Sequence, residues 1–336
     1  MRRVLVTGGS GFIGTNLVDH YLAAGVEVLS IDVRPPRLLL HRRVFRSVDI
    51  LDADSLRAAL RDFAPTQVVH LAARTDLDDR AGLEGYRANV EGVQNAVDAI
   101  AGQSSVARAV FASTKLVCPT DARVTAMDDY RPDTVYGRSK VLGEQRVRNA
   151  ASLRCQWCIV RPTSIWGPWC EIPYGRFFRM VGRGLYFHPG RIDPPKSFGY
   201  VGNVIFQIEA ILAAAQERIH RKVFYLSDYD IFTIRQWADT IARTMCGRAA
   251  RTIPAPLVRP LAWAGDLLKL CGGREAPLSS FRLRNMRADT TGIPLEPTRQ
   301  LTGPLPYSME EGVARTVAWL RGDRLPARQD VLPRAA

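Results

Sequence analysis

Short apolar runs alternate along the first half of the chain with longer segments of helical periodicity. The apolar runs span residues 3–7, 26–31, 68–71, 109–112 and 158–160. The helical pattern is found in segments 54–63, 85–100 and 136–150, and in one that ends near residue 24. Strands that alternate with helices of this length build βαβ units, in which the strands are parallel. The pattern therefore predicts an α/β fold around a parallel sheet.

The pattern changes after residue 161, where proline and glycine become frequent. Helical periodicity returns in segments 204–216, 234–245, 258–270 and 309–319. We interpret residues 1–161 as one domain built on the sheet. Residues 162–320 are predicted to form mainly a smaller lobe over one end of the sheet, with some segments returning to it. Residues 321–336, rich in arginine, proline and alanine, are predicted to form a flexible tail.

Charge adds an expectation about ligands. The 336 residues include 46 lysines and arginines against 33 acidic residues, which gives a net charge of +13. This balance favours anionic ligands. Because the arginines are spread along the chain and no basic block lies next to aromatic residues, we expect a phosphorylated small molecule and no nucleic acid.

The cysteines and the longest apolar runs indicate the compartment. The six cysteines lack the spacing of a disulfide framework or a zinc site. Cys155 and Cys158 lie in an apolar run, so we predict buried thiols and no metal. No apolar run approaches the ~20 residues that a membrane-spanning helix needs, and the N-terminus begins directly with a strand. We expect a cytoplasmic protein with no integral membrane segment.

A glycine-rich loop joins the first strand to the first helix. Gly8, Gly11 and Gly14 allow a tight turn and let backbone amides approach a pyrophosphate, to which the helix adds its positive end. Phe12 and Ile13 belong to the same predicted site. This context predicts a Rossmann-type doubly wound parallel sheet that binds a dinucleotide, with a smaller C-terminal substrate-binding lobe completing the cleft.

The end of the second strand bears on the choice of dinucleotide. Asp32 follows the glycine loop by about 20 residues, where a carboxylate can bind the adenosine ribose hydroxyls. An acidic residue there repels a 2′-phosphate, which favours NAD over NADP. Arg34, which we include in the cofactor site, and Arg37 weaken this preference, since either can pair with a phosphate. NADP therefore stays open.

One predicted helix carries a tyrosine and a lysine one turn apart on the same face, Tyr136 and Lys140. A free tyrosine has a pKa near ~10, and we expect the Lys140 ammonium and a positive nicotinamide ring to lower it. Tyr136 then accepts a proton from a hydroxyl as hydride leaves for the cofactor. Thr114, with Ser113 as its neighbour, ends a strand and can hydrogen-bond the substrate oxygen.

Several motifs follow one another in a characteristic order. They are Thr7-Gly-Gly-Ser-Gly-Phe-Ile-Gly14, Asp49-Ile50, His70-Leu-Ala-Ala73, Asn89-Val-Glu-Gly92, Ser113-Thr114, Tyr136-x-x-x-Lys140 and Arg161-Pro162-x-x-x-x-Gly167-Pro168. Together they resemble the extended short-chain dehydrogenases/reductases, specifically the NAD-dependent nucleotide-sugar epimerase/dehydratase family. The resemblance runs from residue 1 to about 204, with a weaker echo in Ser308-x-Glu-Glu-Gly312.

The resemblance implies roles for further residues. Asp49 and Ile50 flank the adenine, and Lys140 also holds the nicotinamide ribose. The cofactor site implied in this way further contains Leu71, Ala72, Ala73, Asn89, Tyr136 and Pro162. The implied substrate contacts come from Thr75, Thr114, Ser164, Lys196 and Arg282. The resemblance also implies a homodimer formed through the helices near 85–100 and 136–150.

The family shares hydride chemistry, and its members differ in the step that comes after oxidation. The 4,6-dehydratases that this family resembles carry Thr-Asp-Glu where this chain has Thr114-Lys115-Leu116. Without that acid pair we do not expect a dehydratase, and without the glutamate at Leu116 we do not expect a decarboxylase. An epimerase and a ketoreductase of a nucleotide-linked sugar both remain.

The substrate lobe departs from the family pattern. Ser164 stands where an asparagine is usual, and Lys196 stands where an arginine is usual. Lysine can contact a diphosphate only as a point charge, without the bidentate geometry of arginine. The cluster Arg282, Arg284 and Arg287 either compensates for this or is a solvated face.

Two other interpretations stay open. One is a dehydrogenase or reductase of an apolar alcohol such as a hydroxysteroid, supported by a helix predicted at 256–270 that can touch a membrane surface, the core or a partner. The other is a non-catalytic dinucleotide-sensing module. Loss of Tyr136 or Lys140 would mark such a sensor, and both residues are present.

Overall fold

The computed structural model describes residues 1–77, 80, 82–254 and 288–323. The predicted helix at 256–270, the substrate residue Arg282 and most of the predicted tail lie outside the described residues. None of the described helices is long and apolar enough to cross a membrane.

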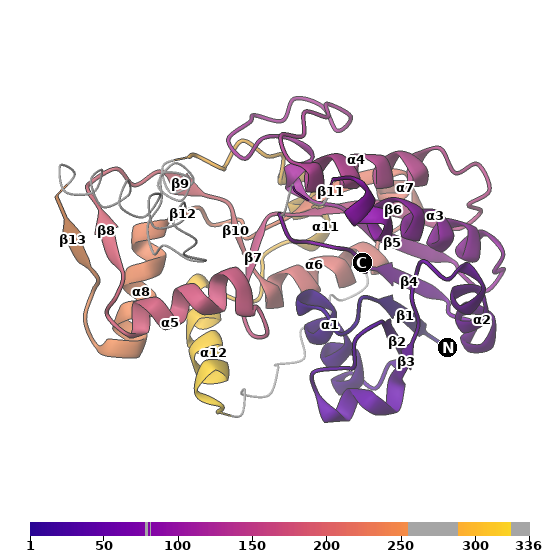
Figure 1. Ribbon diagram of the computed structural model, residues 1–336, viewed down its shortest axis with the longest axis horizontal. Coiled ribbons are helices and arrows are strands. Elements are labelled where there is room, and N and C mark those ends of the chain that lie inside the picture. Colours follow the sequence, from indigo (N-terminus) through magenta and orange to yellow (C-terminus); the bar gives the residue numbers. More distant parts are fainter. Residues whose placement is uncertain (78–79, 81, 255–287, 324–336) are drawn as a thin grey trace.

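A parallel sheet of seven strands forms the larger part of the molecule (Figure 1), in the order β11-β6-β5-β4-β1-β2-β3. Every neighbouring pair is parallel. The chain order reverses between β1 and β4, which is the switch point of a doubly wound sheet. The strands are β1 (Arg3–Thr7), β2 (Glu27–Asp32), β3 (Phe45–Ser47), β4 (Gln67–His70), β5 (Arg108–Ala112), β6 (Gln156–Pro162) and β11 (Lys222–Leu226).

Helices cover both faces of this sheet, because successive strand residues point to opposite faces. Val4 and Val6 of β1 share a core with α1 and α6, whereas Leu5 between them belongs to a second core with α2, α3 and α4. A sheet buried on both faces explains the nearly continuous apolar runs of the sequence. The helices of this domain are α1 (Phe12–Ala23), α2 (Ala53–Phe63), α3 (Arg87–Ala101), α4 (Val135–Arg148), α6 (Val201–Ala213), α7 (Gln216–Ile219) and α11 (Glu296–Thr302).

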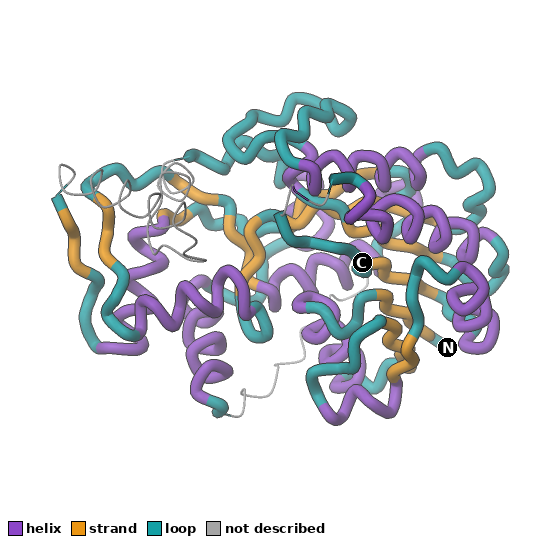
Figure 2. Tube along the Cα trace, in the orientation of Figure 1, coloured by secondary structure: helices purple, strands orange, loops and turns teal. Residues whose placement is uncertain are grey.

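The smaller lobe lies beside the carboxyl edge of the sheet, at the left of Figure 1, and contains short strands as well as helices (Figure 2). An aromatic core holds it together: the ring of Trp237 stacks on Phe177, with centroids 5.0 Å apart, and also contacts Trp166 and Phe198. The paired strands are β7 (Ser164–Trp166) with β10 (Phe198–Tyr200), β8 (Phe187–Pro189) with β13 (Arg251–Ile253), and β9 (Pro195–Lys196) with β12 (Phe232–Thr233). The helices are α5 (Arg176–Gly182), α8 (Ile234–Cys246) and α12 (Met309–Arg321).

Capping residues fix where two of these helices begin. Thr233 accepts a hydrogen bond from the Gln236 amide while the Gln236 side chain accepts one from the Thr233 amide, and Ser308 and Glu311 repeat this arrangement at α12. Such reciprocal caps satisfy amides that the first turn leaves unpaired. The motif around Ser308 is therefore the start of α12.

The predicted α/β fold with a doubly wound parallel sheet is confirmed. Most predicted elements match observed ones within a few residues, and residues 3–7 match β1 at both ends. The return of β11 to the sheet edge, beside β6, places residues 222–226 with the first domain. Helix α6 also packs on this sheet, where it contacts α1 and β5.

Candidate active site

The carboxyl ends of five neighbouring strands gather the residues that the sequence singles out. Thr7, Asp32 and His70 end β1, β2 and β4, while Thr114 and Pro162 lie at the ends of β5 and β6. Strands that run parallel end on the same edge, so residues far apart in the chain meet there. This edge faces the smaller lobe in Figure 1.

The glycine loop between β1 and α1 is too crowded for side chains. Gly8 has a φ of +70°, and a Cβ on it would lie 2.6 Å from the Ala72 nitrogen. A Cβ on Gly14 would lie 2.1 Å from the Gly8 oxygen. The turn therefore requires glycine at these positions, and Gly11 is the N-cap of a 12-residue helix whose first amides no side chain caps. This cradle, in which Phe12 and Ile13 form the first turn, fits the pyrophosphate of a dinucleotide.

Asp32 is buried beside this loop and is held in place by it. Its Oδ2 accepts a hydrogen bond from the Ser10 amide at 3.1 Å, and its Oδ1 accepts one from the Arg34 amide at 3.0 Å. The Arg34 guanidinium lies 3.7 Å from the same carboxylate. The guanidinium of Arg37 donates to the carbonyls of Ser10 and Trp169. Arg37 thus joins the glycine loop to the smaller lobe.

The adenine residues suggested by the resemblance lie at the end of β3. Asp49 is exposed, and its carboxylate accepts a hydrogen bond from the Leu51 amide. Ile50 is buried against α3, where a Cβ on Gly92 would lie 2.5 Å from the Ile50 Cδ1. Both residues are at the carboxyl edge, on the same side of the switch point as Asp32.

The segment Leu71, Ala72 and Ala73 follows β4 and is partly buried. Its position is fixed by Asn89 of α3, which is fully buried and donates to the Arg74 carbonyl and the Ser139 hydroxyl, while its own oxygen accepts from the Arg74 amide. These hydrogen bonds show that Asn89 positions the segment. Direct contact of Asn89 with the cofactor stays a prediction.

Tyr136 and Lys140 lie one turn apart on α4, and both are buried. The Tyr136 phenol is hydrogen-bonded to the Thr114 hydroxyl. The Lys140 Nζ donates to the Ala112 carbonyl at 2.6 Å. The structure therefore brings Thr114, Tyr136 and Lys140 together at the carboxyl end of β5.

Burial dominates the electrostatics of this trio. Burial raises the pKa of Tyr136 to about 12, and the hydrogen bond with Thr114 offsets only part of this. Burial also lowers the pKa of Lys140 to about 8, although the charge of Glu144 acts in the opposite direction. In the chain alone, the cost of removing water from the phenolate therefore decides the direction of the shift. The expected lowering of the Tyr136 pKa by Lys140 together with a nicotinamide ring stays a prediction.

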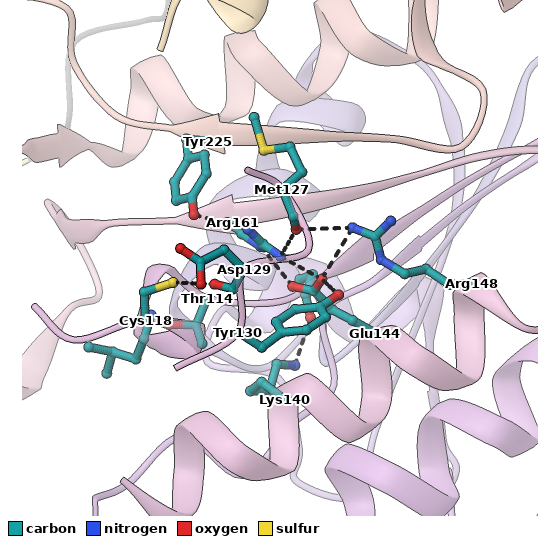
Figure 3. Close-up of polar contacts among 12 residues, drawn as sticks. Thr114, Cys118, Met127, Asp129, Tyr130, Lys140, Glu144, Arg148, Arg161 and Tyr225 are labelled. Atoms are coloured by element: carbon teal, nitrogen blue, oxygen red, sulfur yellow. Dashed lines mark hydrogen bonds and ion pairs between the residues drawn. The ribbon is translucent and has the colours of Figure 1, made fainter. Parts of the chain in front are cut away.

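A buried network behind Lys140 is the main feature that the sequence did not reveal (Figure 3). Glu144, one turn after Lys140 on α4, accepts two hydrogen bonds of 2.8 Å from Arg161 of β6 and one from the Tyr130 hydroxyl. Arg161 also donates to the Tyr225 hydroxyl and the Met127 carbonyl. Burial raises the pKa of Glu144, but Arg161 outweighs it and holds the pKa below its ordinary value. An arginine within an apolar strand is the signal in the sequence that could have indicated a buried partner.

The predicted substrate residues occupy different surroundings. Thr75 is exposed in the loop after Ala73, whereas Ser164 begins β7 and its hydroxyl is hydrogen-bonded to the Tyr174 phenol. Lys196 is buried in β9 and donates to the Ala288 carbonyl. Pro162 closes β6 next to this lobe, and Arg282 lies outside the described residues.

A cavity of about 660 Å³ lies away from this trio. Its lining comes from the end of β11, α11 and the start of α12, and includes Asp228, Arg299 and Tyr307. None of the predicted site residues within the described part of the chain lines it. Its volume therefore does not identify it as the place of the chemistry.

The thiols are buried as expected. Cys158 lies in β6 and Cys155 just before it, and burial raises their pKa values to about 12 and about 11. The five cysteines within the described part of the chain are free. That part also holds no group of three or more side chains placed to bind a metal ion.

Comparisons with known proteins agree with this geometry. Over 338 aligned positions, the chain is 29% identical to a 3 beta-hydroxysteroid dehydrogenase/Delta 5→4-isomerase of Mycobacterium tuberculosis, covering 91% of this chain and 90% of that protein. It is 29% identical to a UDP-glucose 4-epimerase of Vibrio cholerae, covering 69% and 73%. The crystal structure of the UDP-glucuronic acid 4-epimerase of Bacillus cereus, with UDP-glucuronic acid and NAD, has the same fold, with a TM-score of 0.72 at 19% identity over 95% and 99% of the two chains.

The family assignment rests on a separate match, to the model of a protein family. Residues 4–225 match the model of the NAD dependent epimerase/dehydratase family, from β1 to the strand that completes the sheet edge. The match includes the glycine loop, Thr114, Tyr136 and Lys140. The chain therefore belongs to the NAD-dependent epimerase/dehydratase family, whose cofactor is NAD.

Proposed function

We propose that this protein transfers a hydride between NAD and a carbinol or keto carbon of a nucleotide-linked sugar, as an epimerase or a ketoreductase. The observation that carries the proposal is the trio Thr114, Tyr136 and Lys140 at the carboxyl end of β5, beside the glycine loop. These side chains supply an oxygen-binding hydroxyl, a proton donor and a cation within one buried site.

The chain's own residues bind the substrate oxygen and move its proton. We expect the Thr114 hydroxyl and the Tyr136 phenol, which are hydrogen-bonded to each other, to bind that oxygen together. With a pKa raised to about 12, the phenol is protonated at neutral pH and is able to give its proton to an oxygen that gains charge. In the oxidative direction, Tyr136 accepts the proton as a phenolate, a form that the Lys140 ammonium and a bound nicotinamide ring would favour. When bound, NAD supplies the hydride acceptor and a positively charged ring.

The proposed cofactor contacts follow the strand ends. Gly8, Gly11 and Gly14 hold the pyrophosphate, and Asp32 accepts hydrogen bonds from the adenosine ribose. Lys140, whose ammonium lies at the end of β5, holds the nicotinamide ribose. Asp32 is buried, and its carboxylate disfavours a 2′-phosphate. NAD is therefore the proposed cofactor, in preference to NADP.

The step after oxidation distinguishes the enzymes of this family. Lys115 and Leu116 follow Thr114 where a dehydratase needs two acids, and neither side chain carries a carboxylate. A dehydration of the sugar would therefore have neither the acid nor the base that it needs at these two positions. The proposal is therefore limited to two reactions. An epimerase returns the hydride to the carbon from which it came, and a ketoreductase delivers a hydride from reduced cofactor that it takes up from solution.

A second candidate is the oxidation of a hydroxysteroid. The relative from Mycobacterium tuberculosis, which matches 91% of this chain, favours it. Two buried lysines favour an anionic substrate instead: Lys115, which follows Thr114, and Lys196, whose charge acts on Lys115. For this reason we rank the nucleotide sugar first. We also propose that the protein forms a homodimer and does not bind nucleic acid.

Purified protein tests these alternatives directly. NADH or NADPH is added with a panel of nucleotide-linked 4-keto sugars, and the absorbance of reduced nicotinamide is followed. Stoichiometric loss of that absorbance with one sugar means a ketoreductase. Interconversion of the matching hydroxy-sugars without net loss means an epimerase. Turnover of a hydroxysteroid, with no turnover of any nucleotide sugar, would reject the first candidate in favour of the second.

A further inference from the structure

A small cavity adjoins Lys140 in the interior of the first domain. It lies between the strands β4, β5 and β6 and the helices α3 and α4. Its volume of about 10 Å³ gives room for a single water molecule. The polar side chains that line it are each at most 8% exposed and come from His70, Ser113, Lys140 and Glu144. Its other lining residues are apolar or glycine.

Two polar atoms at this cavity lack the contacts that buried groups usually have. The Nδ1 of His70 is hydrogen-bonded to the Thr7 hydroxyl at 2.9 Å, but its Nε2 has no partner within the described part of the chain. Burial, and next the charge of Lys140, lower the pKa of His70 to about 3, so the ring is neutral. In either tautomer, Nε2 then has an N–H or a lone pair to satisfy. No described donor reaches the Ser113 hydroxyl oxygen.

Lys140 has one hydrogen-bond donor more than its known contacts use. An ammonium group has three N–H donors. The Lys140 Nζ gives one to the Ala112 carbonyl at 2.6 Å, and the proposed function gives a second to the nicotinamide ribose. Among the described residues, no side chain or carbonyl accepts the third. The cavity is where this donor can find a partner, because Lys140 belongs to its lining.

We propose that one water molecule occupies this cavity and joins the Lys140 ammonium to His70 and Ser113. The water accepts a hydrogen bond from Lys140, donates one to the Ser113 hydroxyl, and either donates to or accepts from the His70 Nε2. Buried waters commonly make about three such bonds. The inference deepens the proposed function, and its catalytic consequence rests on that function, because Lys140 is the cation of the site. His70 acts through the water and is therefore a positioning residue.

The water stabilises the charged form of Lys140, since an ionised donor forms the stronger hydrogen bond. The titratable groups that lie next to Lys140 in the described structure are Tyr136 and Glu144 on its own helix and His70 on β4. Among these three, only Glu144, which is paired with Arg161, is charged at neutral pH. Loss of the water should therefore lower the pKa of Lys140 without any change of charge nearby.

A crystal structure of the wild-type protein with NAD is the first test. At high resolution, it should show one water within hydrogen-bond distance of the Lys140 Nζ, the Ser113 hydroxyl and the His70 Nε2. A cavity without this water would overturn the proposal. This test does not depend on whether any variant folds.

Two variants separate the roles of the two ring nitrogens of His70. His70→Asn keeps a polar atom near the place of Nδ1, beside Thr7, and loses the one at Nε2. His70→Gln keeps a polar atom near the place of Nε2 instead. Both replacements are neutral, as His70 is. We expect His70→Asn to lower the pKa of Lys140, which is about 8 in the wild type, by about one pH unit. His70→Gln, the matched control, should stay close to the wild type.

NMR measures this titration directly. The chain has only five lysines, so the side-chain signals of isotope-labelled lysine can be assigned, and the signal of Lys140 is the one missing from Lys140→Arg. Spectra are recorded with NAD bound and without substrate, and thermal unfolding verifies that each variant is folded. In turnover assays, the pH above which kcat falls should be lower in His70→Asn by the same amount.

The results that would contradict the inference differ from those that would contradict the proposed function. An unchanged titration of Lys140 in His70→Asn, or an equal change in both variants, would overturn the role of the water, because Nε2 would then not act on Lys140. Absence of turnover with every nucleotide sugar would overturn the proposed function, and the catalytic consequence would fail with it. The water itself would still be decided by the crystal structure and the titration.

Discussion

The ion pair between Glu144 and Arg161 allows a sharp prediction about stability. Both side chains are at most 2% exposed, and Glu144 receives two hydrogen bonds of 2.8 Å from Arg161. Glu144→Met removes one partner and leaves the guanidinium buried without its counter-charge. Breaking a buried pair in this way costs about 3–5 kcal/mol. At about 2 °C per kcal/mol, the melting temperature should fall by about 6–10 °C.

The paired substitution supplies the decisive comparison. Glu144→Met with Arg161→Met removes both charges, so no buried ion is left unpaired, and replacing a whole pair by apolar side chains is often close to neutral. The double variant should therefore be more stable than the Glu144→Met single variant, by about 2 kcal/mol. Glu91→Met is the control, because Arg87 and Glu91 form an exposed pair on α3. Its loss should cost about 0.5 kcal/mol or less.

Urea unfolding, followed by circular dichroism, measures these differences. The pKa of Glu144 lies below its ordinary value of 4.5. Its stabilising contribution is therefore present above that pH and is lost as the pH falls through the lower, folded-state pKa. The gap between wild type and Glu144→Met should narrow in acid. A single variant as stable as the wild type, or a double variant whose loss equals the sum of the single losses, would refute this reasoning.

Three further predictions concern the remaining features of the molecule. Burial raises the pKa of Glu209, but its basic neighbours His20 and Arg2 outweigh burial and hold the pKa at about 2. The contribution of Glu209 to the free energy of unfolding is therefore present above pH 4.5 and is lost as the pH falls toward 2. When the free energy of unfolding is measured at decreasing pH, the wild type should lose about 2–3 kcal/mol that Glu209→Gln does not lose. An equal loss in the two proteins would contradict this prediction. Asp32→Ser should raise kcat/KM for NADP relative to NAD by at least about 10-fold, because a repulsive carboxylate is removed, and an unchanged cofactor ratio would place Asp32 away from the ribose. Light scattering should give twice the chain mass of 37.4 kDa, whereas the mass of a single chain would reject the homodimer.

Local patterns predicted the sheet, because its signals lie within short stretches of sequence. The run at residues 3–7 and the glycines after it specify β1 and the turn into α1 without reference to the rest of the chain. Two strands at the edges of the sheet, β3 and β11, were not predicted. Lys222–Leu226 pairs with β6, more than 60 residues earlier in the chain. Such pairings depend on packing between distant segments, as does the aromatic core around Trp237.

The candidate site was likewise predicted only in part. Thr114, Tyr136 and Lys140 were predicted from spacing and strand ends, and the structure brings them together. The pKa of Tyr136 could not be predicted, because it depends on how completely the folded chain removes water from the phenol. Likewise, nothing in the sequence near Asn89 indicates that its amide is occupied by the Arg74 backbone.

The central claim is that Tyr136 moves the proton that accompanies hydride transfer, and Tyr136→Phe tests it most directly. This variant lacks only the phenolic hydroxyl, and its ring can keep the contact with Tyr86, whose centroid lies 6.2 Å away. Turnover is measured with the nucleotide sugar identified by the assay above, and the affinity for NAD by calorimetry. We predict an unchanged affinity for NAD and a kcat lower by about 10²–10⁴-fold. A variant that turns over its substrate as fast as the wild type would contradict the account.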